Sequence, residues 1–513
     1  MTPLRREILK FLGAASLAVP FGTLGCSLKR GDEPKLLKSQ VRLPEPFVAP
    51  LKIPPTLKPT QSDSAGDLYE ITMGPGRAEI LPGVQTEVWG YDGIFPGPTI
   101  EARSGRRVVI RARNELPVPI VNHLHGGRTP PESDGYPTDF VLPVGGSFPV
   151  SMPDPASIVA QGTREYAYPN EQRAATLWYH DHRMDFTGPQ VWRGLAGFYI
   201  IRDKSEDALP LPRDDRDIPL MICDRSFGAD GSFLYPNLNS SLRDRPGVQR
   251  EYMGGVLGDV ILVNGVPWPR HEVTAARYRF RLLNASNARR YELELDPPPS
   301  DGNSFIQIGS DGGLLDAPIT HSKLKIAPAE RFDVIIDFSK YGVGSIVTLR
   351  NRVGDGQTNQ VMRFHVSSID RDESYVPPRL ASLERLDPAR ASVTRKFHFS
   401  SGDVHGHSGW TINGQPFDPA RMDAQPKLGA VEIWQLSTDI HHPIHLHLVH
   451  FQALSRGDGP GPYNHGWKDT IDLGPVQSLK IIMRFDGYKG RYVFHCHNLE
   501  HEDMAMMGNF EVI

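Results

Sequence analysis

Apolar and polar residues alternate with a period of two through most of the chain after about residue 66. Clear examples are the segments 107–111, 277–281 and 431–434. This period is typical of β-strands with one buried face. No long amphipathic helix pattern interrupts it, and 46 Pro and 49 Gly favour frequent turns. The pattern therefore predicts an all-β fold built from many short strands.

A weak internal repeat divides this pattern into three parts. The turn segments 93–98, 263–269 and 412–417 each lead into a strand, and Gly, Pro or Asn recur at their turns. A repeated element indicates repeated structural units. The length of 513 residues fits about three domains. We therefore expect three β-sandwich domains, at 67–205, 206–380 and 381–513, with a linker rich in Pro at 370–395.

The segment before the first domain has two parts. Residues 1–26 have the order of an export signal, because Arg5 and Arg6 precede an apolar stretch that is too short for a membrane span. The sequence around Cys26 resembles a lipoprotein cleavage site, although Thr23 stands where leucine is usual. We expect export by the twin-arginine route to the periplasm or cell surface, with a lipid anchor at Cys26 left open. A loosely packed N-terminal helix is the alternative.

Residues 27–66 are rich in Pro, Lys and Ser and have no periodicity, so we expect a linker or a strap over the first domain. The net charge is −4, from 56 Lys and Arg against 60 Asp and Glu, and no basic excess points to nucleic acid. There are three cysteines, Cys26, Cys223 and Cys496, which exclude a disulfide framework.

Ten of the 19 histidines fall in four tight groups. Their members are His123 and His125; His180 and His182; His442, His445 and His447; and His495, His497 and His501. Because side chains alternate along a strand, His-x-His places two imidazoles on the same face. Four such pairs supply eight imidazoles without a carboxylate, which favours copper over iron or magnesium. The spacing therefore predicts a copper site that holds more than one ion.

The last group adds a thiolate. Cys496 lies between His495 and His497, so strand alternation directs its side chain to the opposite face. The remaining ligands of a blue-copper electron-transfer site are available in His442, His501 and Met506. Met504 and Met507 compete for the thioether role. One strand would then connect the electron-transfer copper to the histidine cluster by two short covalent paths.

Each feature taken alone has an ordinary explanation. A single His-x-His is more often a surface pair, and His180 with His182 alone would fit zinc. Cys223 reads as a small buried hydrophobe. The four groups together disfavour these ordinary explanations. The other histidines, including His405, His407 and His441, are expected to have no role in metal binding.

These groups, together with residues 95–100 and the last twenty residues, resemble the multicopper oxidases. The best match is the three-domain bacterial type that includes spore-coat laccase, bilirubin oxidase and phenoxazinone synthase, and it covers nearly all of the chain after about residue 45. The resemblance implies three cupredoxin-like Greek-key β-sandwich domains and four copper ions. It also implies that the disulfide of some relatives is absent, because Cys223 is the only cysteine of the middle domain.

The resemblance further implies a role for each ligand. The type 1 copper would be bound by His442, Cys496, His501 and Met506. The type 2 copper would be bound by His123 and His445. The type 3 pair would be bound by His125, His180, His182, His447, His495 and His497. The trinuclear cluster would lie between the first and third domains, and the second domain would act mainly as a spacer. Asp134 and Glu502 match acidic residues that assist proton delivery.

The implied activity is one-electron oxidation of a small-molecule reductant, a phenol, an aromatic amine or a bilirubin-like tetrapyrrole, coupled to reduction of O₂ to water. The expected protein is a monomer. The alternatives are a Cu(I) or Mn(II) oxidase, a copper-free structural member of the fold, and a two-domain nitrite reductase. The complete ligand set disfavours the last two, and the lack of a Met-rich loop between 380 and 430 disfavours a Cu(I) oxidase.

Overall fold

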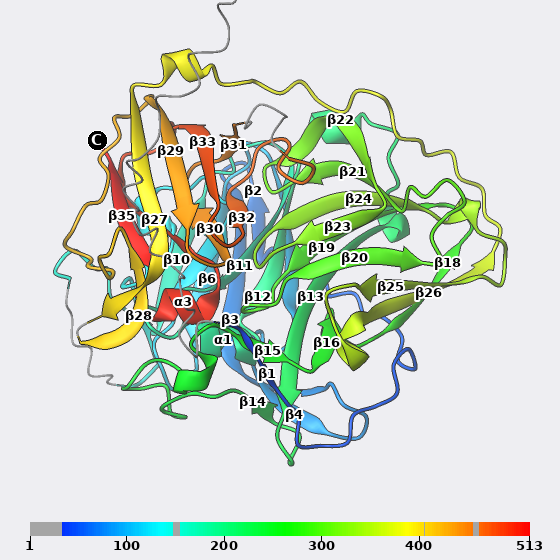
Figure 1. Cartoon of the computed structure of the whole chain (residues 1–513), viewed down its shortest axis with the longest axis horizontal. Helices are drawn as coiled ribbons and strands as arrows, with labels where there is room; N and C mark the ends of the chain where they lie inside the picture. The colour runs from blue at the N-terminus through cyan, green and yellow to red at the C-terminus, as the bar shows by residue number, and fades with distance from the viewer. Residues whose placement is uncertain (1–32, 147–153, 405, 455–460) are drawn as a thin grey trace, which may run out of the picture.

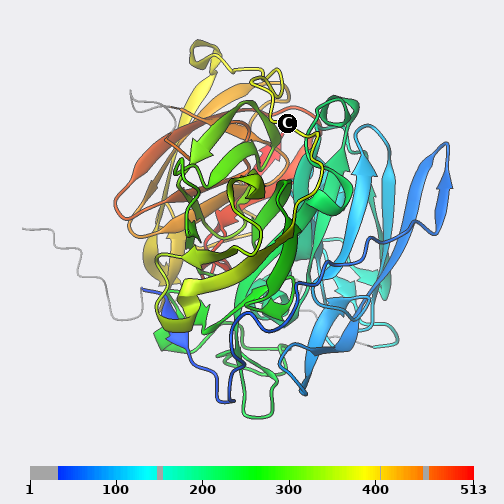
Figure 2. The same cartoon turned by 90° about the vertical axis from the view of Figure 1, so that its right-hand side faces the viewer.

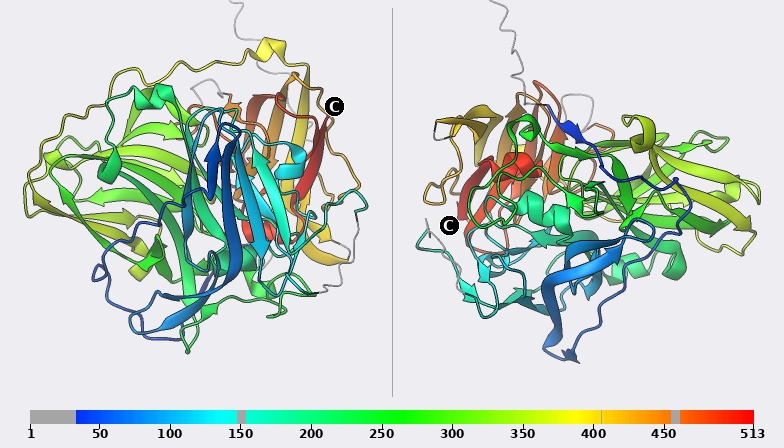
Figure 3. Two further views of the ribbon diagram at one scale, coloured as in Figure 1. Left: turned by 180° about the vertical axis from the view of Figure 1, so that it is seen from behind. Right: turned by 90° about the horizontal axis from the view of Figure 1, so that it is seen from below.

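The computed structural model describes residues 33–146, 154–404, 406–454 and 461–513. The expected export signal and Cys26 lie outside these residues. Within the described ranges, no helix combines the length and apolar character that a membrane crossing needs. Three β-sandwiches make up the molecule (Figure 1), with the third on the left and the second on the right. The first is seen in front in the view from behind (Figure 3).

The first domain packs a five-stranded sheet against a four-stranded sheet. The five-stranded sheet contains β2 (Gln61–Asp63), β3 (Gly66–Glu79), β4 (Gln85–Tyr91), β6 (Val108–Asn114) and β10 (Thr163–Tyr168). The four-stranded sheet has the order β5 (Gly97–Arg103), β12 (Ala196–Arg202), β11 (Ala175–Asp181) and β7 (Asn122–His125). The short strands β8 (Val141–Leu142) and β9 (Ala160–Gln161) pair beside them. Strands β7 and β11 therefore lie at one edge of the sandwich. Strand β7 carries His123 and His125, and β11 carries His180 and leads into His182.

The second domain is the largest sandwich, with eight strands facing five. The first sheet contains β13 (Asp217–Phe227), β14 (Phe233–Leu234), β16 (Val260–Val263), β17 (Val266–Pro267), β19 (Arg277–Asn284), β21 (Phe305–Ser310), β22 (Gly313–His321) and β24 (Arg331–Asp337). The second sheet contains β18 (Arg270–Thr274), β20 (Tyr291–Asp296), β23 (Lys323–Ile326), β25 (Ile346–Asn351) and β26 (Gln360–Ser368). Cys223 is buried in its core and unpaired, as a small hydrophobe.

The third domain repeats the plan of the first. One sheet has the order β28 (His407–Ile412), β27 (Val393–Val404), β29 (Val431–Thr438), β33 (Ser478–Arg484) and β31 (Phe451–Ala453). The other has the order β32 (Thr470–Leu473), β30 (His442–Leu446), β34 (Gly490–Cys496) and β35 (Met507–Val512). The α-helices are short: α1 (Thr187–Arg193), α2 (Lys204–Asp207) and α3 (Leu499–Asp503). The predicted all-β class is confirmed.

The internal repeat corresponds to one tight turn used in all three domains. Its central pairs are Asp92-Gly93, Asn264-Gly265 and Asn413-Gly414, with φ values of 55° and 66°, 50° and 78°, and 54° and 73°. Two consecutive positive φ angles are those of a type I′ turn, which Asn or Asp followed by Gly tolerates best. The repeat therefore marks an equivalent turn, whose central pair in the first domain is Asp92-Gly93.

The segment before the first domain takes a different course from the one expected. Strand β1 (Lys35–Leu37) pairs in parallel with β15 (Val256–Gly258) of the second domain. Further along, Phe47 N donates to Trp268 O at 2.8 Å, and the segment reaches the first domain at Leu57, whose N donates to Thr99 O. Figure 2 shows this blue segment crossing both domains. The prediction of a strap over the first domain was thus wrong for its first part, which instead lies against the second domain.

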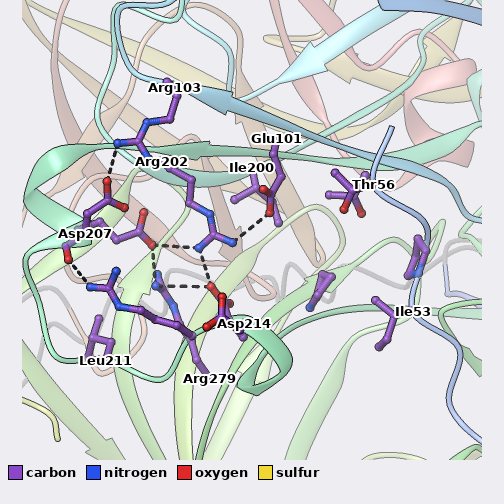
Figure 4. Close-up of a pocket in the computed structure, with 16 residues that line it drawn as sticks. Ile53, Thr56, Glu101, Arg103, Ile200, Arg202, Asp207, Leu211, Asp214 and Arg279 are labelled. Carbon is purple, nitrogen blue, oxygen red and sulfur yellow. Dashed lines mark hydrogen bonds and ion pairs between the residues drawn. The ribbon is translucent and has the colours of Figure 1, made fainter. Parts of the chain in front are cut away.

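Ion pairs fasten the first domain to the second around a pocket of about 430 Å³ (Figure 4). Arg202 of β12 lies 3.1 Å from Glu101 Oε1 and 2.5 Å from Asp217 Oδ2. Arg279 Nη1 of β19 lies 2.6 Å from Glu206 Oε1 in α2. Burial alone would raise the pKa of Glu206, but Arg279 and the neighbouring arginines lower it to about 2. The pocket wall is therefore a network of compensated charges across the domain boundary.

We expect Asp217→Asn to destabilise the protein by about 3–5 kcal/mol, because it removes the buried carboxylate that Arg202 and Arg281 share and leaves the network with an uncompensated positive charge. The matched control is Glu101→Gln, whose side chain is 46% exposed and which should cost at most about 1 kcal/mol. Thermal and chemical denaturation of the two variants measures the difference. Equal stability of both variants would contradict the view that this network joins the domains.

Candidate metal centre

The first domain presents four histidines at the edge formed by β7 and β11. These strands are antiparallel, with His123 opposite His180 and His125 opposite Trp178. The intervening Leu124 packs into the core of the first domain. Strand alternation thus turns the imidazoles away from that core, as the His-x-His spacing predicted.

The third domain presents the matching edge. On β30 and β34, His445 lies opposite His495 and Ile444 lies opposite Cys496. Ile444 and Cys496 belong to the core of the third domain, together with Phe494. The alternate residues, including His495, turn toward the first domain, where His182 Nε2 lies 3.3 Å from His495 Nε2. Cys496 and its neighbouring histidines therefore point to opposite faces of one strand.

Eight imidazoles meet where the two edges face each other, and each is at most 1% exposed. Three groups have ligand nitrogens within 4.8 Å of one another. They are His125, His180 and His497; His182, His447 and His495; and His123, His125 and His445. Four histidines come from each of the two domains. All the clustered histidines of the sequence, apart from His442 and His501, are thus brought into one buried cluster.

Backbone oxygens hold the outer ring nitrogens of three of these histidines. His123 Nδ1 lies 2.5 Å from Asp134 O, His180 Nδ1 lies 2.8 Å from Asp181 O, and His445 Nδ1 lies 3.0 Å from Asp469 O. An acceptor on one nitrogen fixes the hydrogen there and leaves the lone pair on the other nitrogen. Each of these histidines therefore directs a lone pair inward.

The inward nitrogens fit metal ions. Within the described residues, His123 Nε2, His180 Nε2, His445 Nε2 and His125 Nδ1 have no hydrogen-bond partner although they are buried. Such groups are costly unless something else satisfies them. Burial lowers the pKa of all eight imidazoles, to about 4 for His182 and His495. They are therefore neutral at pH 7 and able to coordinate a metal such as copper.

A second group lies inside the third domain. The Sγ atom of Cys496 is 3.4 Å from His442 Nδ1 and 3.6 Å from His501 Nδ1, and these two nitrogens are 3.1 Å apart. Met506 is fully buried in the same core cluster, and its carbonyl accepts a hydrogen bond from Cys496 N at 3.1 Å. Met507 packs in a different cluster, with Tyr136. The thiol of Cys496 and two imidazoles thus converge, and Met506 packs in the same core.

The outer sides of these two imidazoles are also occupied. His442 Nε2 lies 2.9 Å from Asp439 Oδ1, and His501 Nε2 lies 3.2 Å from Gly254 O of the second domain. The indole of Trp410 stacks on His501 with ring centroids 3.7 Å apart. His442 is fully buried, whereas the side chain of Asp439 that contacts it is 22% exposed.

The two predicted acids lie beside the histidine cluster. Asp134 Oδ2 is 2.7 Å from His447 Nδ1. Glu502 Oε1 is 3.4 Å from His182 Nδ1, and its Oε2 is 3.0 Å from His495 Nδ1. Burial raises the pKa of both carboxyl groups, that of Asp134 well above its usual value. In both cases burial therefore favours the protonated form of a carboxyl group at the edge of the cluster.

Several residues around the two groups were missed from the sequence. Asp439, Trp410 and Asp469 all contact clustered histidines. None has a spacing from the histidines that carries a signal, although Asp439 precedes His442 by one short turn. Of the histidines set aside, His441 and His407 are exposed, and His405 lies outside the described residues.

Comparison with known proteins agrees with this geometry. Residues 72–206 and 384–513 match family models described as multicopper oxidase. The laccase of Bacillus subtilis is 39% identical over 91% of this chain and 98% of its own length. The bilirubin oxidase of Albifimbria verrucaria is 36% identical over 90% of this chain and 81% of its own. The crystal structure of a multi-copper oxidase from Pediococcus acidilactici matches with a TM-score of 0.79 and 31% identity, covering 93% of both chains.

Three cupredoxin-like sandwiches with a buried histidine cluster define a copper-dependent oxidoreductase. The chain belongs to the multicopper oxidase family. It is a laccase-like member, which couples oxidation of small-molecule substrates to reduction of O₂. The resemblance seen in the sequence is confirmed.

Proposed function

We propose that the chain binds four copper ions in the two groups described above. The type 1 ion is bound by His442, Cys496, His501 and Met506. The type 2 ion is bound by His123 and His445. The type 3 pair is bound by His125, His180 and His497 on one side and by His182, His447 and His495 on the other. The observation that carries this proposal is the order of β34, where Cys496 enters one group and both flanking histidines enter the other.

The chain itself supplies the connection between the groups. From Cys496 the covalent path runs one residue in either direction to an imidazole of the cluster. Bound copper supplies the one-electron redox chemistry and the reduction of O₂. The protein holds the ligands neutral and dry, and it separates the site of substrate oxidation from the site where O₂ reacts. Substrates give up electrons on the Asp439 side, where a partly exposed side chain contacts the type 1 ligand His442.

Phenols, aromatic amines or bilirubin-like tetrapyrroles are the proposed substrates. The laccases and the bilirubin oxidase among the relatives support this class. Oxidation of Cu(I) or Mn(II) is the second candidate, and a solved relative from Campylobacter jejuni is described as a metallo-oxidase at 26% identity. The scarcity of methionine between 380 and 430 favours the organic substrates.

Asp134 and Glu502 are the proposed proton donors. Reduction of O₂ consumes protons, and the cluster is closed to bulk water. Both carboxyl groups touch type 3 ligands from outside the cluster, one on each side of the domain boundary. Export through the N-terminal signal, with lipid attachment or cleavage at Cys26, and a monomeric state complete the proposal.

Replacing the thiolate tests the type 1 site. Cys496→Ser should abolish the intense blue absorption and oxidase turnover while circular dichroism shows a folded protein, because among the described residues no other thiol lies at the group. Cys223→Ala, which removes the other buried thiol, should keep both. A Cys496→Ser protein that stays blue would overturn the assignment.

Replacing the thioether tests the axial ligand. A weak axial sulfur stabilises oxidised copper, so Met506→Leu should raise the type 1 reduction potential with little change in stability. Met504→Leu is the control, because Met504 is only partly buried beside the same core. Redox titration of the blue band measures both. A shift in the control variant together with an unchanged Met506→Leu protein would transfer the role to Met504.

Replacing Glu502 tests proton delivery. Glu502→Gln should keep the blue copper and its reduction by substrate but slow reoxidation by O₂ by about 10²-fold or more, the contribution of a positioned acid. Asp134→Asn should act in the same direction. Glu500→Gln is the control, because Glu500 is equally buried but accepts from Tyr235 Oη and Val256 N instead. Stopped-flow reoxidation of the fully reduced proteins gives the rates, and parent-like rates in the first two variants would refute the assignment.

A further inference from the structure

A buried ion pair joins the second domain to the third beside the histidine cluster. Its members are Arg331, the first residue of β24, and Asp469, which immediately precedes β32. Their side chains are at most 1% exposed. Arg331 Nη1 donates to Asp469 Oδ1 at 2.7 Å, and Nη2 donates to Oδ2. This bidentate geometry fixes the plane of the carboxylate.

Asp469 contacts one histidine from each half of the cluster. Its Oδ1 lies 3.2 Å from His125 Nε2 of the first domain, and its carbonyl oxygen lies 3.0 Å from His445 Nδ1 of the third. Thr470 Oγ1 donates to Asp469 Oδ1 at 2.9 Å and lies 3.1 Å from His125 Nε2. The two imidazoles stack with centroids 3.6 Å apart. One aspartate therefore holds the outer nitrogens of a stacked pair that spans the domain boundary.

These contacts decide which nitrogens face the metal. The oxygens of Asp469 accept hydrogen bonds, so the hydrogens lie on His125 Nε2 and His445 Nδ1. The lone pairs then lie on His125 Nδ1 and His445 Nε2, both of which lack a partner within the described residues. Both histidines belong to the group of ligand nitrogens that also includes His123. Without Asp469, His125 would have no carboxylate to keep its ring in the Nδ1-coordinating orientation.

The second domain holds Arg331 rigidly. Arg331 Nε donates to Thr176 O of β11 at 3.0 Å, and Arg331 N donates to Asp311 Oδ1 at 2.8 Å. Asp311 Oδ2 in turn lies 3.0 Å from the buried amine of Lys468. A single guanidinium thus touches the first domain at Thr176 and the third at Asp469.

The backbone after His125 leaves room for this pair. Gly126 has φ +83°, and a Cβ atom there would lie 2.7 Å from both Arg331 Nη2 and Asp469 Oδ2. No residue with a side chain fits at this position without displacing the ion pair. The ligand strand β7 therefore ends directly against the salt bridge.

We propose that Arg331 and Asp469 are positioning residues of the copper centre: Arg331 fixes the Asp469 carboxylate, and Asp469 orients His125 and His445 across the boundary between the first and third domains. This inference rests on the proposed assignment of both histidines as copper ligands. The second domain, which supplies no ligand in that assignment, then acts on the histidine cluster through the side chain of Arg331.

The test removes both charges together. In Arg331→Leu/Asp469→Asn neither member of the pair is left as an unpaired buried charge. Arg331→Lys keeps the positive charge but loses the fork of donors. The copper-loaded proteins are titrated with a chelator, and copper content, the type 2 electron paramagnetic resonance signal and the blue absorption are followed. Loss of partners outside the ligands typically weakens metal binding 10–100-fold.

The double variant should therefore lose its type 2 signal and cluster copper at about 10–100-fold lower chelator concentration than the parent, while the blue band persists. Arg331→Lys should lie between the two. The control is Arg289→Leu/Asp224→Asn, which removes another buried ion pair of the second domain, 2.7 Å between Nε and Oδ2. This control should retain the parent chelator sensitivity. If structural damage alone caused the loss of copper, both double variants would lose it.

One more variant separates the inference from the proposed function. His445→Ala should abolish the type 2 signal outright. If it does, and the Arg331 and Asp469 variants keep the parent signal and chelator sensitivity, the positioning role is refuted while the ligand assignment stands. If His445→Ala leaves the signal unchanged, the ligand assignment fails, and the positioning inference fails with it.

Discussion

The alternation of side chains along β34 is the constraint on which the rest of the arrangement depends. Because His495 and His497 point to one side and Cys496 to the other, the two metal groups cannot share one space. The thiolate is placed in the core of the third domain, and the imidazoles leave that core at its surface. A second edge with the same period must then face them, and β7 with β11 provides it. The histidine cluster is therefore an interface, complete only when the first and third domains meet.

Burial of this interface shifts the pKa values of imidazoles and carboxyl groups in opposite directions. Removing water disfavours the charged form of any group, so the pKa of an imidazole falls and the pKa of a carboxyl group rises. The same desolvation lowers the pKa of His182 to about 4 and raises the pKa of Glu502. Burial therefore favours the neutral form of both groups, which lie 3.4 Å apart.

The sequence was sufficient for features that depend on local periodicity. The period of two predicted the fold class, and the spacing around Cys496 predicted that its side chain and the flanking imidazoles point to opposite faces, since strand alternation acts between neighbours in the chain. Asp134 and Glu502 came only from the family resemblance. The roles of Asp469 and Arg331 could not be predicted, because Asp469 contacts His125 across 344 residues and no local pattern indicates such a pairing. The prediction for the first part of the N-terminal strap was wrong for the same reason, since its pairing with β15 has no periodic signal in the sequence.

The second domain also supports the interface between the first and third domains. An interface lined by imidazoles costs desolvation and offers little apolar contact, so it needs support from outside. Asn287 of the second domain provides part of it, since its amide donates to Gly188 O of the first domain at 3.0 Å and to Glu500 Oε1 of the third at 2.9 Å. Arg331 provides the same kind of bridge on another side of the cluster, between Thr176 O and Asp469. With two such bridges the second domain fixes both the distance and the rotation of the two histidine edges, which short hydrogen bonds can do and a flexible linker cannot. The geometry of the copper centre is thus set by a domain that holds none of its proposed ligands.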